Sequence, residues 1–135
     1  MCGILAVFGA ASDVLIAQAQ AAAQLLEHRG PDGQGAHVQP GVGALFHRRL
    51  SIMDPESGRQ PLFGRDGAAV VHNGEIYNHR RLRDELERAG RVFRTGSDSE
   101  VLAHLYEAHG FRLDHEEVDT TWGTPLTEQR FVWTA

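Results

Sequence analysis

The second residue of this chain is a cysteine, followed by a glycine and an apolar run at residues 4–8. Removal of Met1 would leave a thiol and a free α-amino group together on Cys2. An α-amino group titrates at roughly pH 7.7–8.0 in unperturbed models, so it can take the proton of its own thiol without a nearby histidine. This is the N-terminal form of an activated nucleophile. The alternative is that Cys2 is a small buried residue of a first strand.

Four further polar clusters fall on predicted loops or element ends, at residues 29–32, 47–52, 73–78 and 95–100. Taken alone, each has a plain structural explanation. The first ends a helix in a turn, and Asn73-Gly74 in the third is a turn dipeptide. Arg49 is a charge at a strand edge, and Asp98 is an acid in a first helical turn, where the helix dipole favours it. A chemical role therefore depends on their occurring together with Cys2.

Six short sequences occur in one order along residues 1–113: MCGI, HRGPD, RLSI, QPL, NGEIYN and TGSDSE. In this order and approximate spacing they resemble the glutaminase domain of class II glutamine amidotransferases. Within that family, the chain is most similar to the domain of glutamine-hydrolysing asparagine synthetases. The resemblance implies hydrolysis of L-glutamine to glutamate and ammonia, as in asparagine biosynthesis.

The resemblance also assigns catalytic roles. Cys2 resembles the nucleophile that attacks the side-chain amide of glutamine and forms a thioester. Its α-amino group would take the thiol proton and return one to the departing ammonia. Asn73, through its side-chain amide, and Gly74, through its backbone N–H, match the oxyanion hole. Two neutral donors suit a developing oxyanion, and a glycine lets the backbone come close to it.

A second set of residues matches the glutamine-binding pocket. Arg49 matches the residue that holds the α-carboxylate, a task that suits a bidentate guanidinium. Asp98 matches the partner of the α-ammonium group. We expect Arg29 and Asp32 only to shape the loop beside the nucleophile. The other residues of the predicted pocket are Leu50, Ser51, Ile52, Met53, Asn73, Gly74 and Glu75.

The hydrophobic pattern predicts the elements that position these side chains. In the first half we expect a strand at 4–8, a helix from Ser12 or Asp13 to about His28, and a strand at 43–53. The apolar face of that helix would carry Leu15, Ala19, Ala22 and Leu26. In the second half we expect a strand at 69–72, a helix capped by Asn78 and closed by Gly90, and a short strand at Val92 and Phe93. A capping box at 97–100 would open a last helix that runs to Gly110.

The predicted fold class is α+β. The resemblance implies the αββα sandwich of N-terminal-nucleophile hydrolases, incomplete here because most of the second sheet is missing. Residues 1–113 would form the partial amidotransferase domain, and residues 114–135 an irregular tail outside the family. One sheet would then keep an uncovered apolar face. We therefore expect a truncated domain.

Composition and residue patterns argue against several classes of partner, location and cofactor. The chain has 135 residues, a net charge of −5 and no strongly basic stretch, which argues against nucleic acid. No apolar run is long enough to cross a membrane. A single cysteine precludes an internal disulfide, and no signal-peptide pattern occurs, so a cytoplasmic location is predicted. The eight histidines lack metal-binding spacing, so we expect no metal site. The glutaminase step would need no cofactor, since ATP and Mg²⁺ would belong to an absent synthetase domain.

Three hypotheses therefore remain open. The chain is a glutamine-hydrolysing amidotransferase domain that is active alone or with a partner, an inactive fragment, or a glutamine-binding module. The last two need a partner, which would be a synthetase-type chain or a second copy of this one. Turnover that depends on Cys2 separates the first hypothesis from the others, and saturable glutamine binding without turnover identifies the third.

Overall fold

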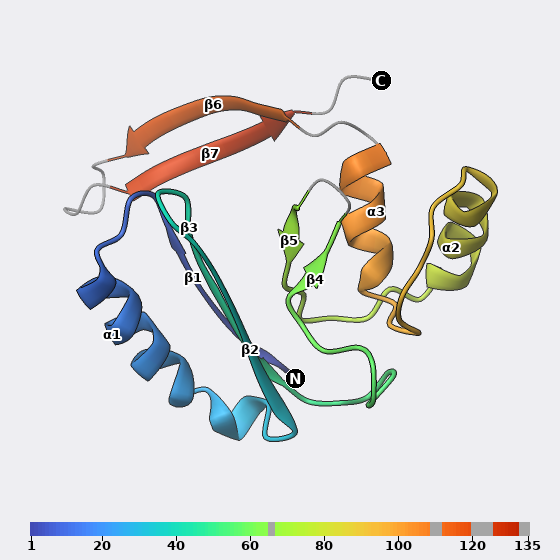
Figure 1. Cartoon of the computed structure of the whole chain (residues 1–135), viewed down its shortest axis with the longest axis horizontal. Coiled ribbons are helices and arrows are strands. Elements are labelled where there is room, and N and C mark those ends of the chain that lie inside the picture. Colours follow the sequence, from blue (N-terminus) through green and yellow to red (C-terminus); the bar gives the residue numbers. More distant parts are fainter. Residues whose placement is uncertain (65–66, 109–111, 120–125, 133–135) are drawn as a thin grey trace.

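A three-stranded antiparallel sheet forms one side of the fold (Figure 1). In this computed structural model, residues 1–64, 67–108, 112–119 and 126–132 are described. The strands are β1 (Gly3–Phe8), β2 (Gly33–Gln39) and β3 (Gly43–Arg49), in the order β1-β3-β2. The register sets Gly3 opposite Arg48 and Gly33 opposite Arg49, so the start of β1 lies beside the end of β3.

Helix α1 (Asp13–Gln24) packs on one face of this sheet. Its buried residues Ala19 and Ala23 contact Ala44 and Phe46 of β3, with Ile16 at the margin. Alternation along the strands sends every second side chain to this face. The Ser12 hydroxyl accepts a hydrogen bond from the Leu15 N–H at 3.3 Å, as its predicted capping role requires.

The predicted length and buried face of this helix are only partly right. The α-helix ends at Gln24 and gives way to a 3₁₀ turn, η1 (Glu27–Arg29), in place of a continuous helix to His28. Leu15 is 45% exposed. The buried face is centred on alanines because small side chains let the helix backbone lie close to the sheet. Sequence periodicity finds such a stripe but does not fix its rotation.

The second half of the chain contributes a small strand pair and two helices. Strands β4 (Leu62–Phe63) and β5 (Ala69–Val70) pair antiparallel. Helix α3 (Glu100–Ala108) packs on both strands, and α2 (His79–Arg88) packs on α3. Across Figure 1 the order is α1, the three-stranded sheet, β4–β5, α3 and α2. The His37 and Phe63 rings meet edge to face at 5.1 Å, which joins the two sheets.

Several predicted features of the two halves need correction. Strand β2 was not predicted, because its Gly and Gln residues give little strand signal. Conversely, Val92 and Phe93 lie in no strand. The Arg83 guanidinium instead packs over the Phe93 ring, with Arg83 Cζ 4.1 Å from the ring centroid. Local β-propensity at 92–93 is thus overridden by tertiary contacts.

The ends of α2 and α3 show which capping signals hold. Gly90 closes α2 at φ +82°, as predicted. Asn78 precedes α2, but its side chain makes no capping bond. The predicted capping box is not formed, because the Glu100 carboxylate accepts the backbone N–H groups of Arg94 and Thr95, both at 2.8 Å. Helix α3 is described to Ala108, and the predicted end at Gly110 lies outside the described residues.

The segment after residue 113 is not irregular where it is described. Strands β6 (Arg112–Asp119) and β7 (Leu126–Val132) pair antiparallel. Neither segment alternates clearly between apolar and polar residues, so the prediction of irregular structure missed a hairpin formed by backbone pairing. No helix in the described ranges has the length and apolar character needed to cross a membrane.

The face of the three-stranded sheet opposite α1 is partly uncovered. Ile4 and Phe8 point to this face, since they alternate with Leu5 and Val7 of the α1 side. Their exposed fractions are 38% and 68%. Phe63, on the facing strand β4, is 44% exposed. The expectation of an apolar sheet face without full cover is therefore met by these residues.

Candidate active site

The Cys2 thiol lies where β1 begins and β3 ends. Gly3 pairs with Arg48, which brings Cys2 to the end of β3, next to Arg49 and Leu50. The Leu50 N–H donates to the Cys2 sulfur at 3.4 Å, and the thiol lies 3.7 Å from the Leu50 carbonyl oxygen. The Arg29 Nε–H donates to the Cys2 carbonyl oxygen at 3.1 Å. The Leu50 backbone thus holds the thiol and the Arg29 side chain holds the Cys2 carbonyl, and Cys2 is half-buried.

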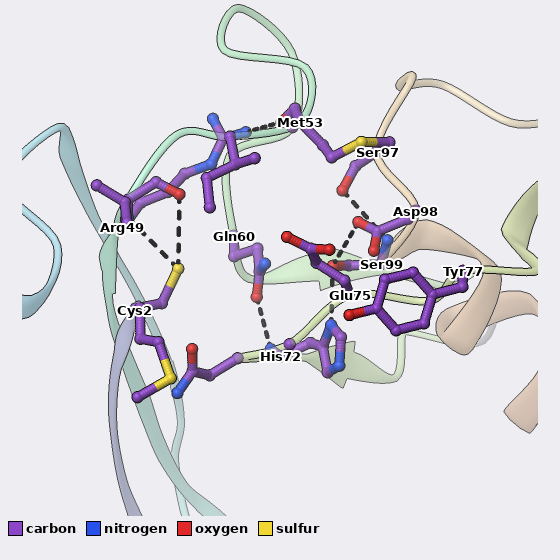
Figure 2. A pocket seen from close by; sticks show the side chains of 16 residues that line it. Cys2, Arg49, Met53, Gln60, His72, Glu75, Tyr77, Ser97, Asp98 and Ser99 are labelled. Carbon is purple, nitrogen blue, oxygen red and sulfur yellow. Dashed lines mark hydrogen bonds between the residues drawn. The ribbon is translucent and has the colours of Figure 1, made fainter.

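The sheet edge, the 50–58 loop and the segments before α2 and α3 enclose a cavity of about 270 Å³ (Figure 2). It gathers residues from four separate parts of the sequence. The residues of the predicted site that line it are Cys2, Arg49, Leu50, Ile52, Met53, Asn73, Gly74, Glu75 and Asp98. Ser51 alone among the predicted site residues is not on this lining. Its N–H donates to the Asp32 carboxylate at 2.7 Å, and the residue lines an adjoining cavity.

Arg49 is a buried cation that lines the same cavity as the thiol, with 6% of its surface exposed. Its Nη2 donates to the carbonyl oxygens of Met53 at 2.6 Å and Asp54 at 2.7 Å. Its Nη1 donates to the carbonyl oxygen of Pro55 at 3.2 Å. These three bonds use three of the five N–H groups of the guanidinium. The predicted carboxylate-binding residue therefore also holds the 53–55 loop in shape.

Asp98 is a buried anion at another part of the cavity wall, with 5% of its surface exposed. Its carboxylate accepts the Ile76 N–H at 2.8 Å and the Ser99 hydroxyl at 3.3 Å. The first bond ties the 73–78 segment to the start of α3. Figure 2 shows Asp98, Ser99 and Tyr77 grouped apart from Cys2 and Arg49. The cavity therefore has a cation and an anion at different positions on its wall.

Asn73 and Gly74 follow β5 and bring a side-chain amide and a glycine backbone to the cavity. Both residues are exposed. Gly74 lies so close to the His72 ring that a β-carbon there would be 2.9 Å from His72 Nε2. A side chain at this position would therefore have to displace the His72 ring.

The cavity also contains residues that sequence reasoning did not assign to the site. These residues are Met1, Gly58, Gln60, His72, Tyr77, Ser97 and Ser99. His72 Nδ1 lies 3.1 Å from the Ser99 hydroxyl, and the His72 N–H donates to the Gln60 side chain at 2.6 Å. Gln60, Tyr77, Ser97 and Ser99 belong to the QPL, NGEIYN and TGSDSE sequences, so that signal was available. His72 directly precedes NGEIYN.

His47 is a buried titratable group close to the site. It is 1% exposed on β3, and neither ring nitrogen has a hydrogen-bond partner of good geometry among the described residues. Burial lowers its pKa from the ordinary value, because the charged imidazolium loses hydration. A contact with the His72 backbone acts in the opposite direction, and repulsion from Arg49 adds to the lowering. In the described part of the chain no group of His, Cys, Asp and Glu side chains is placed to hold a metal ion.

Comparison with known proteins relates the chain to one family. A family model described as a glutamine amidotransferase domain matches residues 1–121. Asparagine synthetase (glutamine-hydrolyzing) 1 of Lotus japonicus is 54% identical over 114 residues, which are 82% of this chain and 19% of that protein. The asparagine synthetase (glutamine-hydrolyzing) of Brassica oleracea is 50% identical over 113 residues, with the same two coverages. That of Sandersonia aurantiaca is 49% identical over 118 residues, or 85% of this chain and 22% of the relative. The chain thus spans about a fifth of the length of the curated relatives it matches.

Proposed function

Because this chain belongs to the glutamine amidotransferase domain family, we propose that it hydrolyses the side-chain amide of L-glutamine through a Cys2 thioester. The observation that carries the proposal is the cavity whose wall contains the Cys2 thiol together with Arg49, Asn73 and Asp98. A thiol, a neutral amide donor, a cation and an anion are the groups that such a reaction on an amino acid requires. The products are glutamate and ammonia.

The reaction begins once Met1 is removed and the α-amino group of Cys2 is free. This amine takes the thiol proton, and the sulfur attacks the amide carbon of glutamine. The C=O electron pair moves to oxygen, where hydrogen bonds from the Asn73 side-chain amide and the Gly74 N–H stabilise the negative charge. The C–N bond then breaks, and the proton held by the amine leaves with ammonia. Water attacks the thioester and releases glutamate and the thiol.

The substrate is held at its α-carbon end. Arg49 binds the α-carboxylate with the N–H groups that its loop contacts leave over. Asp98 binds the α-ammonium group, and Glu75 completes that side of the wall. Leu50, Ile52 and Met53 form the remaining surface. Ser51 lies outside this lining, and its N–H is bonded to Asp32.

The fold that supports this chemistry is an N-terminal-nucleophile hydrolase sandwich with a reduced second sheet. The succession of α1, the three-stranded sheet, β4–β5 and α3 supports this assignment. The step drawn above uses no cofactor. ATP and Mg²⁺ would serve a synthetase domain that consumes the ammonia to form asparagine, and a cytoplasmic location follows for such an enzyme.

A second candidate function is glutamine binding by a module that needs a partner for turnover. The exposed apolar residues Ile4, Phe8 and Phe63 between the two sheets favour it. A synthetase-type chain or a second copy would cover this surface. In this case Arg49 and Asp98 still bind glutamine, but the thiol does not react until the partner is present.

The deciding experiment measures glutamate release from glutamine by the full chain beside a Cys2→Ala variant. Mass spectrometry first establishes that Met1 is absent, and size-exclusion chromatography shows that both proteins are folded to the same extent. We expect turnover that falls at least about 10³-fold in Cys2→Ala. Isothermal titration of glutamine into Cys2→Ala separates the alternatives. Binding without wild-type turnover supports the partner-dependent module, and absence of both contradicts the proposed function.

A further inference from the structure

Asp54 has an unusual backbone conformation beside the cavity. Its φ angle is +46°, which makes it the one residue other than glycine with a positive φ in the described part of the chain. This left-handed region is costly for most side chains, although Asp and Asn tolerate it better than others. The surrounding contacts must therefore hold the residue there.

Asp54 contacts both walls of the cavity. Its carbonyl oxygen accepts the Arg49 Nη2 hydrogen at 2.7 Å and the Gly58 N–H at 3.0 Å. Its carboxylate accepts the Ser57 N–H at 3.0 Å and the Ser57 hydroxyl. The same carboxylate accepts the Gly96 N–H at 2.6 Å, across 42 residues of sequence. One residue thus connects the guanidinium of Arg49 to the loop that carries Asp98.

Two glycines, Gly58 and Gly96, lie at close contacts around Asp54. A β-carbon on Gly58 would lie 2.7 Å from Arg49 Nη2 and 3.2 Å from the Ser97 β-carbon. A β-carbon on Gly96 would lie 3.3 Å from the Asp54 carboxylate. The two loops therefore approach each other through glycines at the level of Asp54.

The Asp54 carboxylate stays ionised near neutral pH. Hydrogen bonds from the Ser57 side chain and backbone lower the pKa of Asp54, and the Gly96 N–H and the Arg49 charge contribute in the same direction. An anionic acceptor makes the stronger kind of hydrogen bond to the Gly96 N–H.

We propose that Asp54 is a positioning residue that fixes the distance between Arg49 and Asp98, and so matches the cavity to the α-carboxylate and α-ammonium groups of glutamine. The inference rests on the proposed function, because it concerns how that substrate is recognised. Asp54 touches no reacting atom. It acts through Arg49 on one side and through Gly96 and the adjoining Asp98 loop on the other.

Asp54→Asn is the test variant, because asparagine keeps the left-handed conformation but cannot offer two anionic oxygens. We expect KM for glutamine to rise about ten- to hundredfold, the cost of a hydrogen bond to a charged group, with kcat changed less than about threefold. Glu56→Gln, an exposed change on the same loop, is the matched control and should leave both constants as in the wild type.

A substrate analogue separates positioning from general loosening. 4-Carbamoylbutanoate carries the reacting amide and the carboxylate but no α-ammonium group. The wild type should prefer glutamine, and Asp54→Asn should reduce that preference, because the distance between the two charged sites is no longer set. An equal loss for both substrates, or an unchanged KM, would overturn the proposal.

A structural readout keeps the test independent of turnover. Hydrogen exchange of the Gly96 amide, followed by NMR, should be at least about tenfold faster in Asp54→Asn than in the wild type. The Leu86 amide in α2 serves as the internal reference. An unchanged Gly96 exchange rate contradicts the positioning role of Asp54, even if the chain hydrolyses no glutamine. The proposed function fails separately if the wild type neither hydrolyses nor binds glutamine. If Gly96 exchange is nevertheless faster in Asp54→Asn, the contact between the two loops through Asp54 still stands.

Discussion

The backbone of Leu50 contacts the Cys2 sulfur with both of its polar groups, the N–H at 3.4 Å and the carbonyl oxygen at 3.7 Å. Two strands far apart in sequence thereby fix the thiol at the edge of the cavity. Since Arg49 immediately precedes Leu50, the same short segment positions both the thiol and the cation proposed to hold the substrate. A ligand that binds Arg49 from within this cavity therefore shares the cavity with the sulfur.

This closeness predicts that glutamine protects Cys2 from alkylation. At a glutamine concentration of ten times Kd, labelling by iodoacetamide should slow about tenfold, because only the free protein reacts. Intact mass measured over time gives the rate, and D-glutamine at the same concentration is the control. Equal protection by both enantiomers would show that the α-carbon groups are not recognised.

Asn73→Ala should lower kcat for glutamate release by about 10²–10³-fold, the usual cost of one lost oxyanion donor. Cys2 labelling in the absence of glutamine should keep its wild-type rate, because the side-chain amide of Asn73 acts only when charge develops on the substrate. Asn78→Ala is the control within the same segment, since the Asn78 side chain makes no capping bond to α2. Similar losses in the two variants would argue for a folding defect.

Gly35→Ala should destabilise the fold by about 1–3 kcal/mol, the range found for overpacked sites. Its β-carbon would lie 1.8 Å from the Gln60 carbonyl oxygen, where the 58–62 segment crosses β2. Gly33→Ala on the same strand is the control, because its β-carbon would meet only the Arg49 β-carbon at 3.8 Å. Urea unfolding compares the two. A smaller loss for Gly35→Ala than for Gly33→Ala would contradict the observed crossing.

The burial of His47 predicts that the fold loses stability in mild acid. Burial lowers its pKa in the folded state, whereas in the unfolded chain it titrates near pH 6.5. The unfolded state therefore binds more protons below about pH 6.5, and the free energy of unfolding falls as the pH drops toward the folded pKa, by at most about 1.4 kcal/mol per pH unit. Above that window both states are neutral at this residue and its contribution is constant.

Urea unfolding at pH 7.5, 6.5 and 5.5 measures this slope. His47→Gln should flatten it, and His28→Gln, a change at an exposed histidine, should not. Should His47→Gln fail to fold, NMR titration of the His47 ring in the wild type gives the answer directly. A folded-state pKa at or above 6.5 would contradict the prediction.

The sequence alone identified most of the candidate site and part of the fold. The strands predicted at 4–8 and 43–53, of which the second ends at Arg49, and the cap at Ser12 rather than Asp13 follow from local signals that act within a few residues. The family follows from six short sequences in order, and these sequences also contain eight of the nine predicted residues that line the cavity. Such patterns survive in one dimension because each has its physical reason within its own segment.

Tertiary structure decided the rest, because those features depend on contacts between distant segments. The strand at 33–39 forms only because β3 offers it a partner, and the hairpin after residue 112 forms by backbone pairing without a side-chain pattern. Ser51 turns away from the cavity because Asp32 takes its N–H. Asp54 has no distinguishing sequence signal, and only the folded chain brings its carboxylate to Gly96. The sequence thus determined which chemical groups are present, and the three-dimensional packing determined how far apart they are held.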